Sequence, residues 1–201
     1  MKRKKLHSRK EKALRRVALA VALLLAVNYV QLGFYLFPAQ ALWESREYYG
    51  LTEMKVIHRE DLTFLSEGEE ALHLAVLDWD FPWGWFVYSG SAIDCAGDGA
   101  VHAAWEYRES TGDQESIAVF GRVDDQNVRS IEIYFREYEK LLEEGQTPHT
   151  ARFTVDEFIK TENGRCFLTF FEWEKDTCIK TLIAYDAEGN VVEQQELARG
   201  W

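Results

Sequence analysis

A long apolar segment near the amino terminus constrains this 201-residue chain more than any other feature. The 21 residues from Val17 to Phe37 carry no charged side chain, and Pro38 follows them directly. A helix of this length rises about 31 Å, which matches the roughly 30 Å of hydrocarbon in a bilayer. A helix also satisfies its own backbone amides, as lipid demands. We therefore predict a transmembrane helix over residues 17–37.

The charge on the two sides of this segment differs in sign. Residues 1–16 contain nine of the 23 basic residues but only one of the 34 acidic residues, so that 14 basic and 33 acidic residues follow. Because basic tails stay on the inner side of a membrane, we predict that residues 1–16 are cytoplasmic and that the C-terminal part is extracytoplasmic. A body this acidic repels phosphate backbones, which excludes nucleic acid as a partner. The lipid bilayer is the first partner that we expect.

A small-residue motif leaves a second fate of the segment open. Ala39-Gln40-Ala41 resembles a signal-peptidase site, and cleavage after Ala41 would give a secreted protein. The apolar run is longer than the hydrophobic region of a signal peptide, which usually has ~7–15 residues. This length favours a retained, single-pass membrane anchor.

The cysteine count is odd, so at least one of Cys95, Cys166 and Cys178 stays unpaired within one chain. If residues 165–173 and 178–185 form a hairpin, Cys166 and Cys178 do not face each other. We favour buried free thiols that pack as small apolar residues, with one disulfide as the alternative.

Residues 38–110 are expected to form a juxtamembrane helix and a small α+β subdomain. The helix is predicted within residues 39–57, where Leu42 and Tyr49 lie at helical spacing and Gly50 provides a stop. The hydrophobic period then changes to two, and turn signals separate the runs. The predicted strands cover residues 54–58, 62–65, 71–79, 85–88 and 102–107.

Residues 111–201 show clearer alternation, as in Ile131 and Ile133 on one face and Glu132 on the other. Their spacing is typical of a β-sandwich. The predicted strands cover residues 116–123, 129–135, 153–160, 165–173, 178–185 and 191–197. Between the last two, residues 186–190 form a predicted hairpin turn in which Gly189 supplies a positive φ.

Two stretches of this second half carry a family resemblance. Residues 121–133 (GRVDDQNVRSIEI) and 184–192 (AYDAEGNVV) resemble bacterial immunoglobulin-like extracellular domains. The part beyond the apolar segment, including residues 55–60 (KVIHRE) and 81–85 (FPWGW), is similar to small membrane-anchored extracytoplasmic proteins of Gram-positive bacteria. The resemblance implies an envelope location and carries over no catalytic residue, and the three cysteines depart from the expected pattern. The fold class that follows is mainly β, with an N-terminal transmembrane helix, an α+β subdomain and an immunoglobulin-like β-sandwich.

An aromatic cluster is the most distinctive local feature of the sequence. Four rings share one parity of an extended chain: Trp79, Phe81, Trp83 and Trp85. Pro82 and Gly84 indicate a bend among them. One interpretation buries these rings in the core. The other makes them an exposed binding surface for a sugar, a peptide or the lipid interface, since contiguous exposed aromatic side chains usually mark binding.

The sequence contains no recognisable catalytic or metal motif. Ser89 and Ser91 flank Gly90 without forming a G-x-S-x-G elbow, and no zinc-ligand spacing occurs. The acidic turns around Asp124 and Asp186 leave calcium binding open, although Asp and Asn are also ordinary turn formers. We therefore expect no catalytic residue, no cofactor and no metal.

These features favour a non-enzymatic, membrane-tethered binding domain of unknown specificity. Its expected partner is another envelope protein or a cell-wall component, and Asn28 and Gln31 would assist association of the membrane helices. One alternative is an envelope hydrolase whose site is not visible in the sequence. Another is a regulatory or sensory subunit that acts through a membrane partner, because residues 1–16 are too few for a signalling domain.

Overall fold

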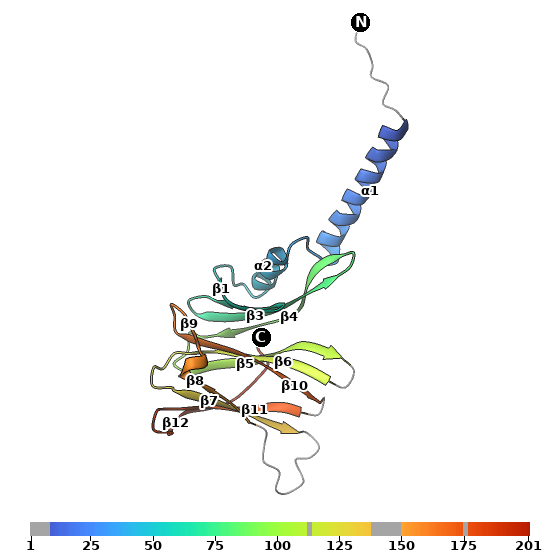
Figure 1. Ribbon diagram of the computed structural model, residues 1–201. Helices are drawn as coiled ribbons and strands as arrows, with labels where there is room; N and C mark the ends of the chain where they lie inside the picture. Colours follow the sequence, from blue (N-terminus) through green and yellow to red (C-terminus); the bar gives the residue numbers. More distant parts are fainter. Residues whose placement is uncertain (1–8, 112–113, 138–149, 175–176) are drawn as a thin grey trace.

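The computed structural model describes residues 9–111, 114–137, 150–174 and 177–201. The fold is mainly β, with two N-terminal helices followed by three antiparallel four-stranded sheets (Figure 1). The helices are α1 (Arg9–Gln31) and α2 (Pro38–Tyr48). The first sheet has the order β1 (Lys55–Glu60), β2 (Thr63–Glu67), β3 (Ala71–Asp80), β4 (Gly84–Asp94).

The other two sheets are built from the second half of the chain. The second sheet has the order β5 (Val101–Thr111), β6 (Gln114–Val123), β10 (Arg165–Glu174), β9 (Ile159–Lys160). The third has the order β12 (Val191–Glu196), β11 (Thr177–Tyr185), β7 (Ser130–Glu137), β8 (Thr150–Thr154). A 3-10 turn (Val155–Glu157) separates β8 from β9.

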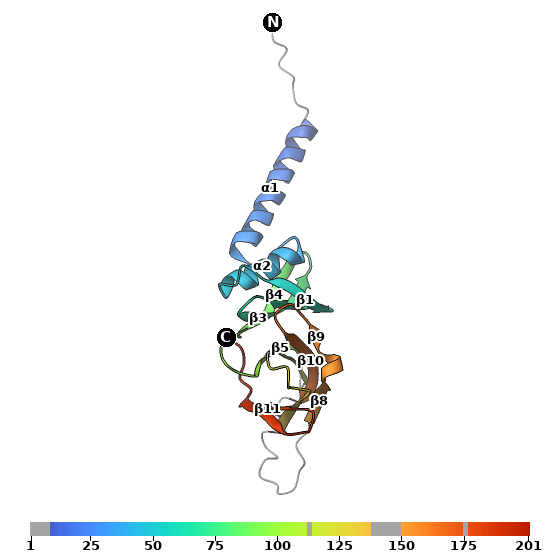
Figure 2. The same cartoon turned by 90° about the vertical axis from the view of Figure 1, so that its left-hand side faces the viewer.

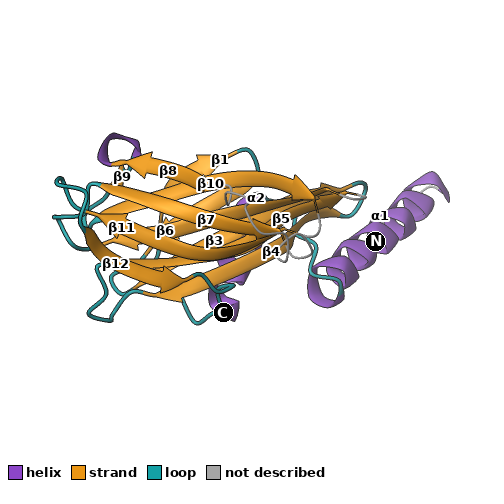
Figure 3. Ribbon diagram, turned by 90° about the horizontal axis from the view of Figure 1, so that it is seen from below, coloured by secondary structure: helices purple, strands orange, loops and turns teal. Residues whose placement is uncertain are grey.

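These elements stack in layers, with α2 on the first sheet, the second sheet beneath it and the third sheet last (Figures 1 and 2). The strands of the stacked sheets run in broadly similar directions, as seen from below (Figure 3). Helix α1 projects away from the sheets at the end where α2 lies. We refer to the three sheets together as the body (residues 55–201).

Among the described residues, strands β2, β3 and β6 are buried on both faces over much of their length, because layers cover them from both sides. In β3, Leu72 and Leu74 pack against the second sheet, whereas Ala75 and Leu77 pack toward α2. In β6, every residue from Ser116 to Val123 is buried. This explains why residues Ile117–Phe120 of β6 form a continuous apolar run rather than an alternating pattern.

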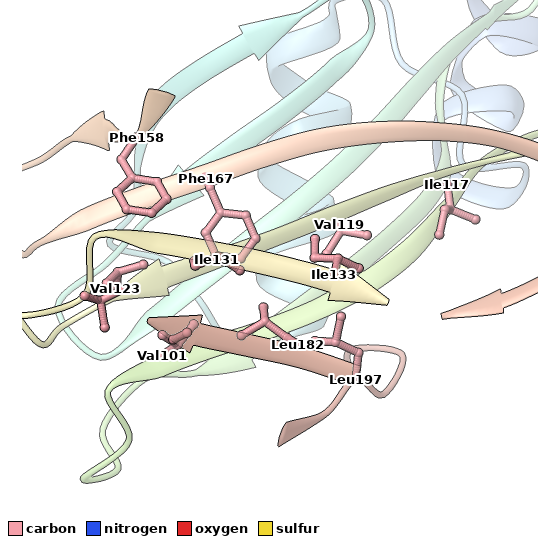
Figure 4. Packing of buried hydrophobic residues seen from close by; sticks show 12 residues of the cluster. Val101, Ile117, Val119, Val123, Ile131, Ile133, Phe158, Phe167, Leu182 and Leu197 are labelled. Atoms are coloured by element: carbon pink, nitrogen blue, oxygen red, sulfur yellow. The ribbon is translucent and has the colours of Figure 1, made fainter. Parts of the chain in front are cut away.

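The core between the second and third sheets consists of aliphatic and aromatic side chains from both (Figure 4). Val119 contributes from the second sheet, and Ile133 and Leu182 contribute from the third; all three are fully buried. Phe167 stacks against Phe153 with ring centroids 6.4 Å apart. The two sheets therefore enclose one hydrophobic core.

The predicted strands of both halves are confirmed, but two are much longer than expected: residues 85–88 belong to β4 (Gly84–Asp94) and residues 102–107 to β5 (Val101–Thr111). The run predicted over residues 153–160 is divided between β8, the 3-10 turn and β9. The predicted turn at residues 186–190 is confirmed, and Gly189 has a φ of +85°. The helix expected within residues 39–57 is shorter, because the chain leaves it after Tyr48 and Gly50 adopts a φ of +72°.

The helix predicted over residues 17–37 is shifted toward the amino terminus. Helix α1 ends at Gln31, Gly33 has a φ of +67°, and Tyr35 pairs with Trp85 of β4 instead of continuing the helix. Among the residues that the structure describes, no helix combines the length and the apolar character needed to cross a membrane.

Two connections between strands concern points that the sequence left open. The boundary expected between residues 110 and 111 falls at the end of β5, and β5 and β6 pair from Val101↔Val123 to Thr111↔Gln114. The hairpin considered between β10 and β11 is not formed, because β10 pairs with β6 and β9 while β11 pairs with β7 and β12.

The C-terminal residues Ala198–Trp201, which we call the C-terminal clasp, lie between the first and second sheets. Trp201 exchanges two backbone hydrogen bonds with Ala92 of β4, at 2.9 and 3.2 Å. On the other side, Trp105 of β5 donates to the Ala198 carbonyl and accepts from Gly200 N–H. The clasp thus satisfies backbone groups at the edges of two sheets.

Candidate binding surface

The aromatic cluster lies at the tip of the β3–β4 hairpin. The two strands pair from Ala71↔Asp94 to Asp80↔Gly84, and the chain turns over residues 81–83. The predicted bend is confirmed, and the Phe81–Pro82 peptide bond is cis. Trp79 and Trp85 face each other across the strands, with ring centroids 5.4 Å apart.

Backbone hydrogen bonds hold this hairpin to the segment between α1 and α2. Tyr35 N–H donates to the Trp85 carbonyl at 2.6 Å, and Trp85 N–H donates to the Tyr35 carbonyl at 2.8 Å. A Cβ atom on Gly84, whose φ is +123°, would lie 2.5 Å from the Tyr35 carbonyl oxygen. Glycine is therefore required both by the backbone conformation and by the close approach of the two segments.

The four predicted site residues divide into two groups. Trp85 is half-buried and packs against the cluster formed by Tyr35, Leu77 and their neighbours. The other three are exposed, by 45% for Trp79, 82% for Phe81 and 38% for Trp83. We call these three residues the aromatic tip. The structure thus places one ring in a core and three at the surface.

The sequence reasoning missed two apolar neighbours of the aromatic tip. Leu36 and Phe37 are 56% and 63% exposed, and they follow directly after the bridging residue Tyr35. The hairpin is joined to Tyr35, which follows the end of α1 by four residues, and its tip lies close to that end of the helix in Figure 1. Parity within residues 79–85 could reveal the shared face of the rings, but no local signal reveals their contact with residue 35.

Among the residues that the structure describes, no serine and histidine form an accessible catalytic pair. Ser45 Oγ and His73 Nε2 are 3.0 Å apart, but the exposed fractions of these two residues are only 5% and 0%. Ser89 donates to the Tyr107 carbonyl, and Ser91 is fully buried beside the C-terminal clasp. A substrate cannot reach the Ser45–His73 pair without opening the fold.

His73 is held neutral by its surroundings. Burial disfavours the imidazolium and Arg46 repels it, which together lower the pKa of His73 from 6.5 to about 3. Its Nδ1 atom has no hydrogen-bond partner among the described residues. Tyr49 covers the ring at a centroid distance of 5.5 Å. The group is thus a buried neutral imidazole between α2 and the first sheet.

Two cysteines are confirmed as buried free thiols, Cys95 and Cys166. Burial raises the pKa of Cys95 to about 12, and burial together with Glu67 raises the pKa of Cys166 further. Both thiols are therefore unreactive at neutral pH. The side chain of Cys178 lies outside the described residues, so its prediction is not tested.

The carboxylates considered for calcium bind groups of their own turns. Asp186 accepts hydrogen bonds from the backbone N–H of Glu188 and of Asn190, at 3.0 and 2.8 Å. Asp124 forms an ion pair with Arg122 at 2.7 Å. Within the described residues, no three His, Cys, Asp or Glu side chains are arranged to hold a metal ion.

A shallow hollow of about 560 Å³ lies beside β1 and β2. Its lining includes Glu53, Glu69 and Glu162, and Lys55 forms an ion pair with Glu162 at 3.3 Å. These groups are solvent-exposed, so the hollow offers little beyond a charged rim. The aromatic tip is the more distinctive surface, since exposed rings are costly in water.

Neither family models nor curated proteins nor solved structures match this chain. The geometry and chemistry of the molecule are therefore the basis for a proposed function.

Proposed function

We propose that this protein is a membrane-tethered domain that binds a partner on the extracytoplasmic side, without catalysing a reaction. One observation in particular supports a membrane tether. The adjacent residues Leu23, Leu24 and Leu25 are 58%, 55% and 40% exposed, although successive residues point about 100° apart around a helix. Helix α1 thus presents apolar side chains on several sides, as a helix in lipid does.

Burial of these side chains in lipid is strongly favourable. Among the described side chains of α1, seven large apolar ones from Val17 onward are at least 40% exposed: Val17, Leu19, Val21, Leu23, Leu24, Leu25 and Val27. Full burial of each contributes roughly 1.5–3 kcal/mol, so that their transfer to lipid contributes on the order of 10 kcal/mol. This free energy of transfer is as large as the free energy of unfolding of many domains, so it strongly favours an apolar environment for α1.

The tether has to include residues beyond the end of α1. From Val17 to Gln31 the helix rises roughly 22 Å, which is less than the roughly 30 Å of hydrocarbon. Leu32, Leu36 and Phe37 continue the exposed apolar stretch. We therefore place residues 32–37 at the outer boundary of the lipid and the basic tail on the inner side, in agreement with the positive-inside rule.

The strand order supports the finer prediction of an immunoglobulin-like sandwich. When the strands β5 to β12 are lettered A, B, C, C′, D, E, F and G, the second sheet reads A-B-E-D and the third reads G-F-C-C′. Immunoglobulin domains distribute their strands between two sheets in this manner. Such sandwiches are common binding modules, which supports a binding role alongside the resemblance of the sequence.

Alkaline extraction of membranes tests the tether. The protein is expected to stay in the pellet after a carbonate wash, whereas the double variant Leu23→Lys/Leu24→Lys is expected in the supernatant. Each lysine at the centre of a membrane helix costs about 3 kcal/mol, so two cost about 6 kcal/mol. Val56→Lys, at an exposed position of β1, is the matched control and should be retained. Release of the unmodified protein would contradict the proposal.

A further inference from the structure

We infer that the aromatic tip lies in the interfacial layer of the membrane that holds α1, as a second point of attachment for the body. This inference rests on the proposed tether and adds to it. It names the lipid interface as the ligand of Trp79, Phe81 and Trp83.

The aromatic tip is rigidly linked to the tether. Tyr35 and Trp85 are joined by two backbone hydrogen bonds, and the Phe34 and Phe86 rings are in edge contact at 5.4 Å. Gly84 approaches Tyr35 too closely for any side chain to intervene. These contacts hold the hairpin against residues 34–35. If lipid surrounds the end of the tether, the aromatic tip therefore lies next to that lipid.

The exposed apolar surface of the body is unevenly distributed. Seven large hydrophobic residues of the body are exposed in the described part of the chain: Val56, Trp79, Phe81, Trp83, Tyr88, Val191 and Trp201. Three of these seven fall within the five residues 79–83. The aromatic tip is thus a local concentration of apolar side chains, and it occurs at the end of the body nearest α1 (Figure 1).

The chemistry of these rings suits a membrane interface. Trp side chains prefer the boundary between lipid and water, where the ring is buried and its N–H stays hydrated. Phe81, the most exposed of the three, has no polar group and suits a deeper position. Beside the rings, the Asp78 carboxylate accepts a hydrogen bond from the backbone N–H of Trp79 at 2.6 Å.

Two attachments have a consequence that a single tether does not have. A body joined to α1 alone would be free to tilt about residues 32–37. With the aromatic tip in the interface as well, the first sheet is held near the membrane and the third sheet points away from it. The surface offered to an extracytoplasmic partner is then the distal one.

Site-specific fluorescence in vesicles tests this inference. The full chain, with an environment-sensitive probe on Phe81→Cys, is reconstituted into phosphatidylcholine–phosphatidylglycerol vesicles with and without lipids that carry a quencher near the head group. Val191→Cys, an exposed position on the third sheet, is the matched control. Protein without an added cysteine gives the background from the native thiols, of which Cys95 and Cys166 are buried; labelling of Cys178 is subtracted with it.

The probe at residue 81 is expected to emit at shorter wavelength and to be quenched severalfold more than the probe at residue 191. Flotation of the same sample reports the tether independently. If the chain floats with the vesicles but both probes behave alike, the inference is overturned and the tether remains. If the chain does not float, both the inference and the proposed tether are overturned.

Discussion

Replacement of Gly200 by valine is expected to lower the free energy of unfolding by about 3–5 kcal/mol, among the largest effects of any single change in this chain. A Cβ atom at this position would lie 1.9 Å from Ser91 Oγ and 2.8 Å from the Ala92 carbonyl oxygen. Ser91 is fully buried, so neither neighbour can move away freely. The C-terminal clasp would have to leave the space between β4 and β5.

Expulsion of the clasp removes more than its backbone hydrogen bonds. Arg199 donates to both carboxylate oxygens of Glu106, at 2.6 and 2.9 Å, and the exposed fraction of Glu106 is only 1%. Without Arg199 this buried carboxylate loses its counter-ion, which is strongly destabilising. Arg199 is itself half-exposed, which reduces the loss relative to a fully buried pair.

Thermal unfolding measures the effect of the clasp. A loss of this size corresponds to a decrease in Tm on the order of 10 °C for a domain of this length. Ala198→Val adds a similar volume two residues earlier at an exposed side chain and should leave Tm nearly unchanged. Equal melting temperatures for the two variants would show that the clasp does not occupy this position.

Acidification is expected to destabilise the protein through His73. The pKa of His73 is about 3 in the folded protein and 6.5 in the unfolded chain, so the unfolded chain binds one more proton between these values. The stabilisation by the neutral ring is complete above pH 6.5 and is lost as the pH falls toward 3. At about 1.4 kcal/mol per pH unit, the loss is on the order of 4 kcal/mol.

A comparison with His73→Gln isolates this contribution from that of the many carboxylates. Glutamine preserves a hydrogen bond to Ser45 but does not titrate. Urea unfolding at pH 7 and at pH 4 should show a larger decrease for the unmodified protein than for the variant, by about 3 kcal/mol. Parallel decreases in the two proteins would mean that His73 is protonated in the folded state or lies at the surface.

The sequence predicted the strands well because most strands have a pattern that follows from their own burial. β7 alternates because one face lies in the core, and β6 is apolar from Ile117 to Phe120 because sheets cover both of its faces. The turn at Asp186–Asn190 is equally local, since Asp186 accepts hydrogen bonds within its own turn. Such features depend on near neighbours in the sequence and can therefore be predicted from it.

The features that the sequence did not reveal depend on contacts between distant segments. The C-terminal clasp has only four residues and no periodicity, and its position depends on unpaired edges of β4 and β5. The end of α1 at Gln31 follows from the pairing of Tyr35 with Trp85, fifty residues later. The four aromatic residues share a parity, but only the tertiary contact of Trp85 separates it from the three exposed rings.

Thiol labelling of intact cells tests the central claim most directly, namely that a lipid-held α1 presents the body on the outer side of the membrane. Cells that produce the Val191→Cys variant are treated with a membrane-impermeant maleimide before and after lysis, with the unmodified protein as background. We predict that the membrane fraction contains the protein and that labelling before lysis equals labelling after lysis. Labelling that appears only after lysis would contradict the claim.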